Sequence, residues 1–213
     1  MKHIKAVVFD MDGVLVDARQ WHYLALNKAL ELFGFVITLE DHESIFDGLP
    51  TRKKLEIIST KNGLPDSLHS FINELKQKYT IELVHKYCRP TFKHEYALQQ
   101  LKQADYKIGL ASNSIIATIN LMMEKTSLKK YLDSVISAEN VVNGKPDPEI
   151  YVKIFEKLLV DPCEVVVIED NVNGIIAATQ AGAHVLRVEN PSEVNIDRIL
   201  SFIEEIEEQT CSL

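Results

Sequence analysis

FDMDGVLVD occupies residues 9–17 and directly follows an apolar run that begins at Ile4. Successive side chains of a strand point to opposite faces. Asp10 and Asp12 are therefore expected to point the same way, at the end of a buried strand that breaks at Gly13. Two carboxylates this close repel each other and lose solvation together. A fold seldom accepts this free-energy cost unless a cation or a shared proton offsets it. We interpret the pair as chemical machinery; the alternative is a helix cap or surface turn that happens to hold two aspartates.

Length and charge restrict the class of protein. The chain has 213 residues and is 46% hydrophobic, which is enough for a sizeable core and a smaller second domain. Its net charge of −8, without any basic run, argues against nucleic-acid binding. No apolar stretch approaches the ~20 residues of a membrane span and no signal-peptide pattern is present, so we expect a cytoplasmic protein that does not bind membranes. The cysteines are far apart, without a CxxC pair, and are expected to be free thiols: Cys88, Cys163 and Cys211.

Short β-branched runs alternate with amphipathic segments along most of the chain. This alternation predicts an α/β protein with a doubly wound parallel sheet. The predicted strands are 4–9, 107–111, 134–137, 165–168 and 184–188, and the helical segments between them are 115–125, 148–159 and 174–181.

The alternation fails after the first strand, where only helical patterns occur. These cover residues 18–33, 52–62 and 66–87. We therefore predict an inserted helical cap at residues 18–95, with residues 1–17 and 96–213 forming the α/β core.

Open α/β sheets place their sites outside the carboxyl ends of the strands. Ser112 and Asn113 follow the second predicted strand, just before a helix, where they form a natural phosphate cradle or an ordinary helix cap. Lys145 lies in a turn after the third strand that lacks P-loop spacing. Glu169 and Asp170 end the fourth strand. Two acidic pairs at one sheet edge, beside a lysine and a serine, predict a hard-cation site that handles an anion.

These motifs together resemble the haloacid dehalogenase-like phosphohydrolase superfamily over nearly the whole chain. Its four motifs occur in order, with Asp10, Asp12 and Gly13 corresponding to the DxDGx(V/T) motif, Ser112 to the strand-end serine, Lys145 to the GKPxP lysine and residues 169–170 to the acidic pair. The helical block after the first motif is similar to that of the β-phosphoglucomutase-like and sugar-phosphate phosphatase subgroup. The resemblance implies a Rossmann-like core with a helical cap.

The resemblance also implies how a small phosphorylated substrate would react. Asp10 would attack phosphorus and form an aspartyl-phosphate. Asp12 would protonate the leaving oxygen and then activate water, a task that favours a raised pKa.

The resemblance implies Mg²⁺ as the cofactor. The ion would be held by the Asp10 carboxylate, the Asp12 backbone carbonyl and Asp170, with Glu169 ligating it or orienting a water. The phosphoryl oxygens would be neutralised by Ser112, the Asn113 N–H and Lys145. Alternatively, Lys145 only pairs with Asp10.

Cap residues are predicted to choose the substrate, and the candidates are Asp17, His22 and Arg52. His22 lies five residues after Asp17, where β-phosphoglucomutase-like members carry a histidine that gates the general acid; the alternative is an ordinary surface histidine. Arg52 begins a helix where the family's mutases hold a second phosphate, or it is simply exposed. Lys76 faces either the cleft or solvent. Two aromatic residues belong either to the core or to a sugar-binding surface: Trp21 and Phe46.

The segment after the strand-end serine bears on the choice between hydrolase and mutase. β-Phosphoglucomutases typically carry Ser-Lys-Asn there, whereas this chain has Ser114-Ile115-Ile116, which leaves Arg52 and Ser114 to hold a second phosphate. Losing a charge-assisted contact costs about 1.5 to 3 kcal/mol. We therefore predict a monomeric phosphomonoester hydrolase acting on a sugar phosphate. A phosphohexose mutase is the first alternative, and a catalytically idle sugar-phosphate-binding protein is the second.

Overall fold

The computed structural model describes residues 3–46 and 48–211. The side chains of Glu43, Thr210 and Cys211 are outside that description, so the predicted free thiol of Cys211 is not among the described groups. The other two cysteines are free thiols, as predicted: Cys88 is buried and Cys163 is exposed.

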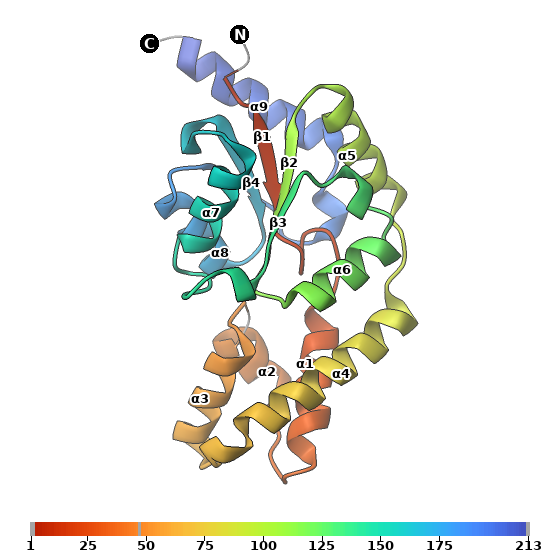
Figure 1. Ribbon diagram of the computed structural model, residues 1–213, viewed down its shortest axis with the longest axis vertical. Helices are drawn as coiled ribbons and strands as arrows, with labels where there is room; N and C mark the ends of the chain where they lie inside the picture. The colour runs from red at the N-terminus through yellow and green to blue at the C-terminus, as the bar shows by residue number, and fades with distance from the viewer. Residues whose placement is uncertain (1–2, 47, 212–213) are drawn as a thin grey trace.

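The core is a parallel five-stranded sheet in the order β3-β2-β1-β4-β5 (Figure 1). In β1, Ala6 lies opposite Lys107 of β2 on one side and Val165 of β4 on the other. All four residues of β1 are buried, because helices cover both faces of the sheet and both faces must be apolar. The predicted doubly wound sheet is confirmed. Its strands are β1 (Ala6–Phe9), β2 (Lys107–Ala111), β3 (Ser134–Ile136), β4 (Val165–Glu169) and β5 (His184–Arg187).

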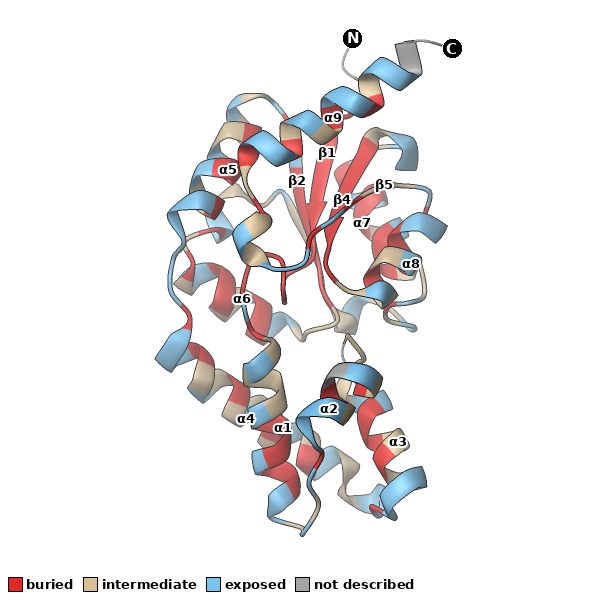
Figure 2. Cartoon of the chain, turned by 180° about the vertical axis from the view of Figure 1, so that it is seen from behind, coloured by how far each residue is buried: buried red, intermediate tan, exposed pale blue. Residues whose placement is uncertain are grey.

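Alternate residues of each strand feed two apolar clusters, one on each face. Val7 and Phe9 pack with α5 (Phe92–Gln103), α6 (Ile116–Lys125) and α9 (Ile196–Cys211). Ala6 and Val8 pack with α7 (Glu149–Leu158) and α8 (Val172–Gln180). Figure 2 shows the resulting buried layers on either side of the sheet.

A helical cap lies at the carboxyl end of the strands (Figure 1). It has an apolar cluster of its own, in which Leu26, Leu30, Leu55, Ile58 and Ile72 are buried. The predicted insertion of a helical cap after the first strand is confirmed. Its elements are α1 (Arg19–Glu31), α2 (Leu39–Asp41), the π-helix His42–Phe46, α3 (Thr51–Asn62), the 3-10 turn Asp66–Leu68 and α4 (His69–Tyr87).

Some details differ from the sequence-based expectation. The helical turns at 39–46 were not predicted, and the predicted helix 66–87 begins with a separate 3-10 turn. Helix α5 begins at Phe92, inside the predicted cap range, yet it packs against β2 and α9 of the core. The exact domain boundaries stay a prediction. Further 3-10 turns are Lys129–Tyr131, Ala138–Asn140, Pro162–Glu164 and Pro191–Glu193.

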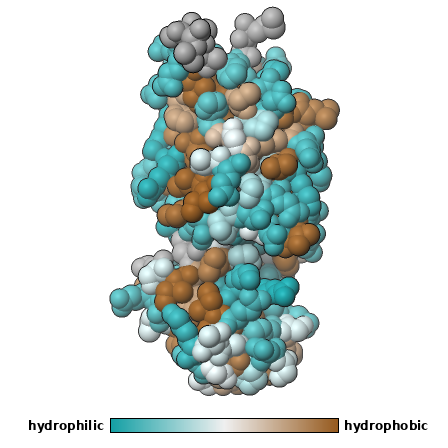
Figure 3. Space-filling model, turned by 90° about the vertical axis from the view of Figure 1, so that its left-hand side faces the viewer, coloured by the Kyte–Doolittle hydropathy of each residue, from teal (hydrophilic) through white to brown (hydrophobic). Residues whose placement is uncertain are grey.

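Within residues 3–46 and 48–211, no helix is both long enough and apolar enough to cross a bilayer. The hydropathy view of Figure 3 shows apolar residues scattered among polar ones on the face it presents.

Candidate active site

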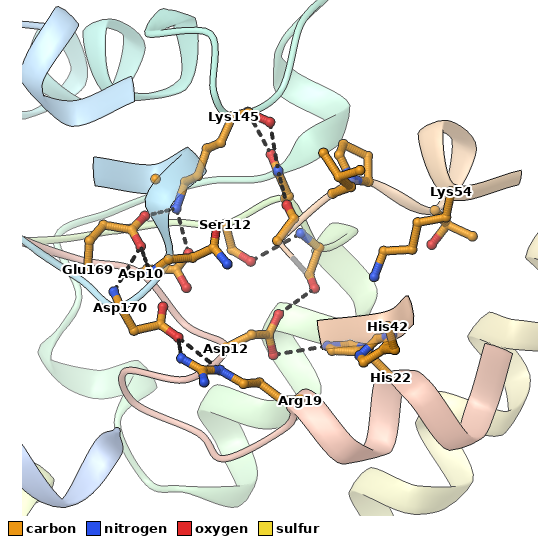
Figure 4. Close-up of a pocket in the computed structure, with 18 of the residues that line it drawn as sticks. Asp10, Asp12, Arg19, His22, His42, Lys54, Ser112, Lys145, Glu169 and Asp170 are labelled. Carbon is orange, nitrogen blue, oxygen red and sulfur yellow. Dashed lines mark hydrogen bonds and ion pairs between the residues drawn. The ribbon is translucent and has the colours of Figure 1, made fainter. Parts of the chain in front are cut away.

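A pocket lies between the carboxyl ends of the strands and the cap (Figure 4). Core and cap both line it, because the loops that leave β1, β2, β3 and β4 meet the first turns of α1 and α3 and the middle of α4 there. Its core residues include every core position that the sequence predicted, namely Asp10, Asp12, Ser112, Asn113, Ser114, Lys145, Glu169 and Asp170. Its cap residues include Arg19, His22, His42, Lys54 and Lys76.

Three buried carboxylates gather at the tips of β1 and β4. Asp10, Glu169 and Asp170 each place one oxygen within 4.8 Å of the others. Two glycines make room for them: a Cβ at Gly13 would lie 2.0 Å from Asp170 Oδ2, and a Cβ at Gly174 would lie 1.9 Å from Glu169 Oε1. The cluster therefore depends on glycine at both places.

Lys145 binds two of these carboxylates. Its Nζ donates to Asp10 Oδ1 at 2.5 Å, to Glu169 Oε1 at 2.6 Å and to the Ala111 carbonyl at 2.9 Å. Burial lowers the pKa of Lys145, but the two carboxylates outweigh burial and raise its pKa above the usual value. Lys145 therefore remains an ammonium. The Tyr151 hydroxyl donates to the same Glu169 oxygen.

The pKa of Asp10 is raised well above its usual value. Burial is the largest cause, Lys145 opposes it, and the negative charges of Glu169 and Asp170 add to the rise. A divalent cation at the cluster would favour the ionised carboxylate that a nucleophile needs. Three clustered carboxylates supply the oxygen donors that Mg²⁺ prefers, so the donor set fits this ion.

The Asp12 side chain points away from the carboxylate cluster and toward the cap (Figure 4). Its Oδ2 accepts a hydrogen bond from Ser114 Oγ at 2.9 Å, and its Oδ1 lies 3.1 Å from His22 Nε2. Lys76 Nζ lies 3.2 Å from His22 Nδ1. An ammonium can only donate, so Nδ1 accepts and Nε2 carries the proton that faces Asp12. His22, predicted as a cap residue that gates the general acid, thus contacts Asp12 directly.

The environment of Asp12 differs from the expected one. Burial raises the pKa of Asp12, but His22, Ser114 and Lys76 together outweigh it, so the pKa lies below the usual value. The expectation of a raised pKa is wrong for this arrangement, because its cap neighbours stabilise the carboxylate. The pKa of His22 is itself lowered, by burial first and then by the charge of Lys76.

Ser112 and Asn113 lie where the second strand ends. Ser112 is buried, and its Oγ accepts from the Ser114 N–H at 3.1 Å. The Asn113 side chain donates to the Gly48 carbonyl at 3.1 Å and accepts from the Lys145 N–H at 3.1 Å. Sequence reasoning considered only the Asn113 N–H, whereas the side chain joins a cap loop to the lysine turn.

Several predicted cap contacts are not formed. The Arg52 side chain is 87% exposed, pairs with Glu56 one helical turn away and does not line the pocket. Asp17 is exposed and also does not line the pocket. The two aromatic candidates pack against apolar clusters and do not line the pocket: the half-buried Trp21 stacks on Tyr87 and packs against the core cluster, and Phe46 is buried in the apolar cluster of the cap.

The pocket and network residues that sequence reasoning missed include four that carry a polar side chain near the charges of the site: Arg19, His42, Lys54 and Tyr151. Lys54 carried a usable signal. It lies four residues before Ile58, so it shares the buried face of α3. Tyr151 lies six residues after Lys145 in the next helix, and residue type alone did not indicate its contact with Glu169.

The comparison with known families agrees with this geometry. A model of the haloacid dehalogenase-like hydrolase family matches residues 7–188. The chain belongs to this family. The resemblance inferred from the four motifs is thereby confirmed.

Members of the haloacid dehalogenase-like family with different reactions are similar to this chain. A phosphorylated carbohydrates phosphatase of Thermotoga maritima is 35% identical over 182 residues, which cover 84% of this chain and 82% of that protein. A β-phosphoglucomutase of Bacillus subtilis is 29% identical, covering 84% of this chain and 80% of its own length. The crystal structure of a β-phosphoglucomutase from Clostridium difficile matches with a TM-score of 0.82 at 26% identity and covers 95% of this chain and 98% of that one.

Proposed function

We propose that this chain is a Mg²⁺-dependent phosphomonoester hydrolase that acts on a small phosphorylated sugar through an aspartyl-phosphate. The observation that carries this proposal is the placement of Asp10 and Asp12. Both line the same pocket, but Asp10 lies in the buried carboxylate cluster, whereas the Asp12 side chain is turned toward His22 of the cap. The 35% identity to a phosphorylated carbohydrates phosphatase supports the substrate class.

The first step uses Asp10 as the nucleophile. A carboxylate oxygen of Asp10 bonds to phosphorus, and the bond from phosphorus to the ester oxygen breaks. The leaving oxygen takes up the proton of Asp12, which enters this step as the carboxylic acid and not as the carboxylate that His22 and Ser114 favour in this structure. Ser112, Asn113 and Lys145 are proposed to stabilise the phosphoryl oxygens as charge develops on them.

The second step regenerates the enzyme. Asp12, now a carboxylate, takes a proton from a water molecule whose oxygen attacks phosphorus, and the bond to Asp10 breaks to release inorganic phosphate. His22 and Ser114 stabilise the carboxylate form of Asp12, which is the form that this step needs.

Asp10, Glu169 and Asp170 would hold the magnesium ion. When bound, it supplies positive charge that lets an anionic nucleophile approach an anionic phosphate. We also propose the Asp12 backbone carbonyl as a further magnesium ligand, on the basis of the family resemblance. The Asp12 side chain contacts His22 of the cap and is not proposed as a ligand.

The cap side of the pocket suits a polyhydroxylated or anionic group. Lys54 and Lys76 are both buried lysines that line it, and His22 lies between Lys76 and Asp12. We propose that these residues, instead of Arg52, contact the part of the substrate that does not react.

A phosphohexose mutase is the second candidate, because β-phosphoglucomutases are among the similar proteins. The geometry favours the hydrolase. Both groups that were predicted to hold a second phosphate are engaged elsewhere: Arg52 pairs with Glu56 in solvent, and the Ser114 hydroxyl donates to Asp12.

The first test is a phosphatase assay over a panel of small sugar phosphates with and without Mg²⁺. We expect Mg²⁺-dependent release of phosphate, and we expect Asp10→Asn to reduce it by about 10³-fold or more while the protein stays folded. Asp66→Asn is the matched control, because the Asp66 side chain is 88% exposed and lies outside the pocket. Turnover by Asp10→Asn at the rate of the control would refute the proposed nucleophile, and no activity over the panel would favour the idle sugar-phosphate-binding protein.

A second assay separates the two reactions. The enzyme is given β-glucose 1-phosphate together with glucose 1,6-bisphosphate as primer. The hydrolase proposal expects free phosphate to form faster than glucose 6-phosphate. The opposite order would establish the mutase.

A further inference from the structure

A cation from the cap reaches into the carboxylate cluster of the core. Arg19 is the first residue of α1, and both its Nε, at 3.1 Å, and its Nη2 donate to Asp170 Oδ2. The Asp170 side chain is only 2% exposed, whereas the Arg19 side chain is 42% exposed. The guanidinium thus enters from the solvent side and ends on a buried carboxylate (Figure 4).

The contact is built into the loop that follows β1. A Cβ at Gly13 would lie 2.0 Å from Asp170 Oδ2 and 3.1 Å from Arg19 Nε. The absence of a side chain at Gly13 therefore opens the space in which the carboxylate and the guanidinium meet.

Two cationic side chains bind different carboxylates of this cluster. Lys145 binds Asp10 and Glu169, and Arg19 binds Asp170. Asp170 is also one of the three carboxylates that suit a divalent cation. Because an arginine cannot lose its proton at any ordinary pH, a metal ion drawing on Asp170 must compete with a permanent positive charge.

We propose that Arg19 is a resident counter-ion that competes with Mg²⁺ for Asp170. In the metal-free enzyme the guanidinium neutralises this carboxylate and ties α1 to the core; when Mg²⁺ binds, that tie is weakened and the guanidinium is released toward the pocket. This inference rests on the proposed magnesium site. By thermodynamic reciprocity, the contact that stabilises the metal-free state lowers the affinity for the metal by the same factor.

Arg19→Gln tests the inference by direct binding. Mg²⁺ is titrated calorimetrically into metal-free protein, without substrate. We expect the variant to bind Mg²⁺ about three- to tenfold more tightly than the wild type, since a partly exposed ion pair no longer opposes the metal. Arg19→Lys keeps the charge but loses the two-nitrogen grip, so its affinity should fall between the other two.

Thermal unfolding gives a second, independent readout. Without metal, Arg19→Gln should unfold at a lower temperature than the wild type, because Asp170 is left beside two other carboxylates. At saturating Mg²⁺ this difference in unfolding temperature between the variant and the wild type should disappear. Arg52→Gln removes the same charge from an exposed cap position and should match the wild type in both experiments.

The outcomes are distinguishable. Equal or weaker Mg²⁺ binding by Arg19→Gln, or a melting gap that Mg²⁺ does not close, would overturn the role of Arg19 and leave the magnesium site standing. If neither the wild type nor any variant binds Mg²⁺, the magnesium site fails, and both the proposed metal dependence and this inference fail with it.

Discussion

Lys76 is a buried cation that the fold keeps near its point of deprotonation. Burial, and after it the charge of Lys54, lowers the pKa of Lys76 to about 8. The usual value for a lysine is about 10.4. At neutral pH the ammonium still donates to His22, and His22 in turn faces Asp12. His22 therefore connects the positive charge of Lys76 in the cap to Asp12, the proposed general acid and base.

The unfolding free energy should report this shift. Between about pH 8 and about pH 10.4 the unfolded chain binds more protons at this lysine than the folded protein does, so stability rises with pH over that window. Lys76→Met should remove this rise and stabilise the protein at pH 7 by about 1–3 kcal/mol, while lowering turnover because His22 loses its donor. Urea unfolding at several pH values measures the effect.

Lys78→Met is the control for this experiment. Lys78 is on the same helix but exposed, so its replacement should leave the pH dependence unchanged. If the unfolding free energies of the Lys76 and Lys78 variants changed with pH in the same way, the proposed lowering of the Lys76 pKa by the fold would be wrong.

Helix α8 holds a glycine where a helix ordinarily favours alanine. Alanine is better than glycine inside helices by about 1 kcal/mol. At Gly174, however, the added Cβ would lie 1.9 Å from Glu169 Oε1, the oxygen that Lys145 and Tyr151 bind. The local preference of the helix is overridden by the site that the helix supports.

Gly174→Ala should therefore destabilise the protein by about 1–3 kcal/mol and lower its phosphatase activity, because Glu169 must move away from Lys145. Chemical unfolding and the phosphatase assay measure the two effects. Gly34→Ala is the comparison: Gly34 has open space around it but a φ of +79°, so the change should cost about 1 kcal/mol without affecting turnover. A more stable and fully active Gly174→Ala enzyme would contradict this role of the glycine.

The elements also show what the sequence could and could not predict. The core half of the site was predictable, because the carboxyl ends of parallel strands meet at one edge, which brings Asp10 and Asp170 together and leaves the turn after β3 to carry Lys145 to them. The cap half depended on which way a helix faces. Residues two apart on a helix differ by roughly 200°, so Arg52 points to solvent while Lys54 points into the pocket.

Core and cap have distinct apolar clusters, which are joined at the end of α4, where Val84 packs in the core cluster; across the pocket the two parts meet through polar contacts. His22 faces Asp12, the Asn113 side chain donates to Gly48, and Arg19 binds Asp170. Because few apolar groups join the two parts at the pocket, we expect the cap to open as a unit and a bound ligand to favour the closed form.

Hydrogen exchange can measure this closure. With Mg²⁺ and a phosphate mimic such as orthovanadate at about ten times its dissociation constant, the backbone amides at 19–22, 48–49 and 51–54 should exchange about tenfold more slowly. Amides at 58–62, at the far end of α3, should change little and serve as the internal control. Equal protection over all of α3 would indicate that the ligand rigidifies the cap itself.

The central position of β1 has a consequence for how the molecule fails on heating. This strand is hydrogen-bonded along both edges and covered on both faces, so the backbone that carries Asp10 belongs to the segment that separates last. We expect the cap, with its smaller apolar cluster, to unfold first. A warmed sample should accordingly lose discrimination among phosphate esters before it loses the capacity to cleave them, passing through a promiscuous stage on its way to inactivity.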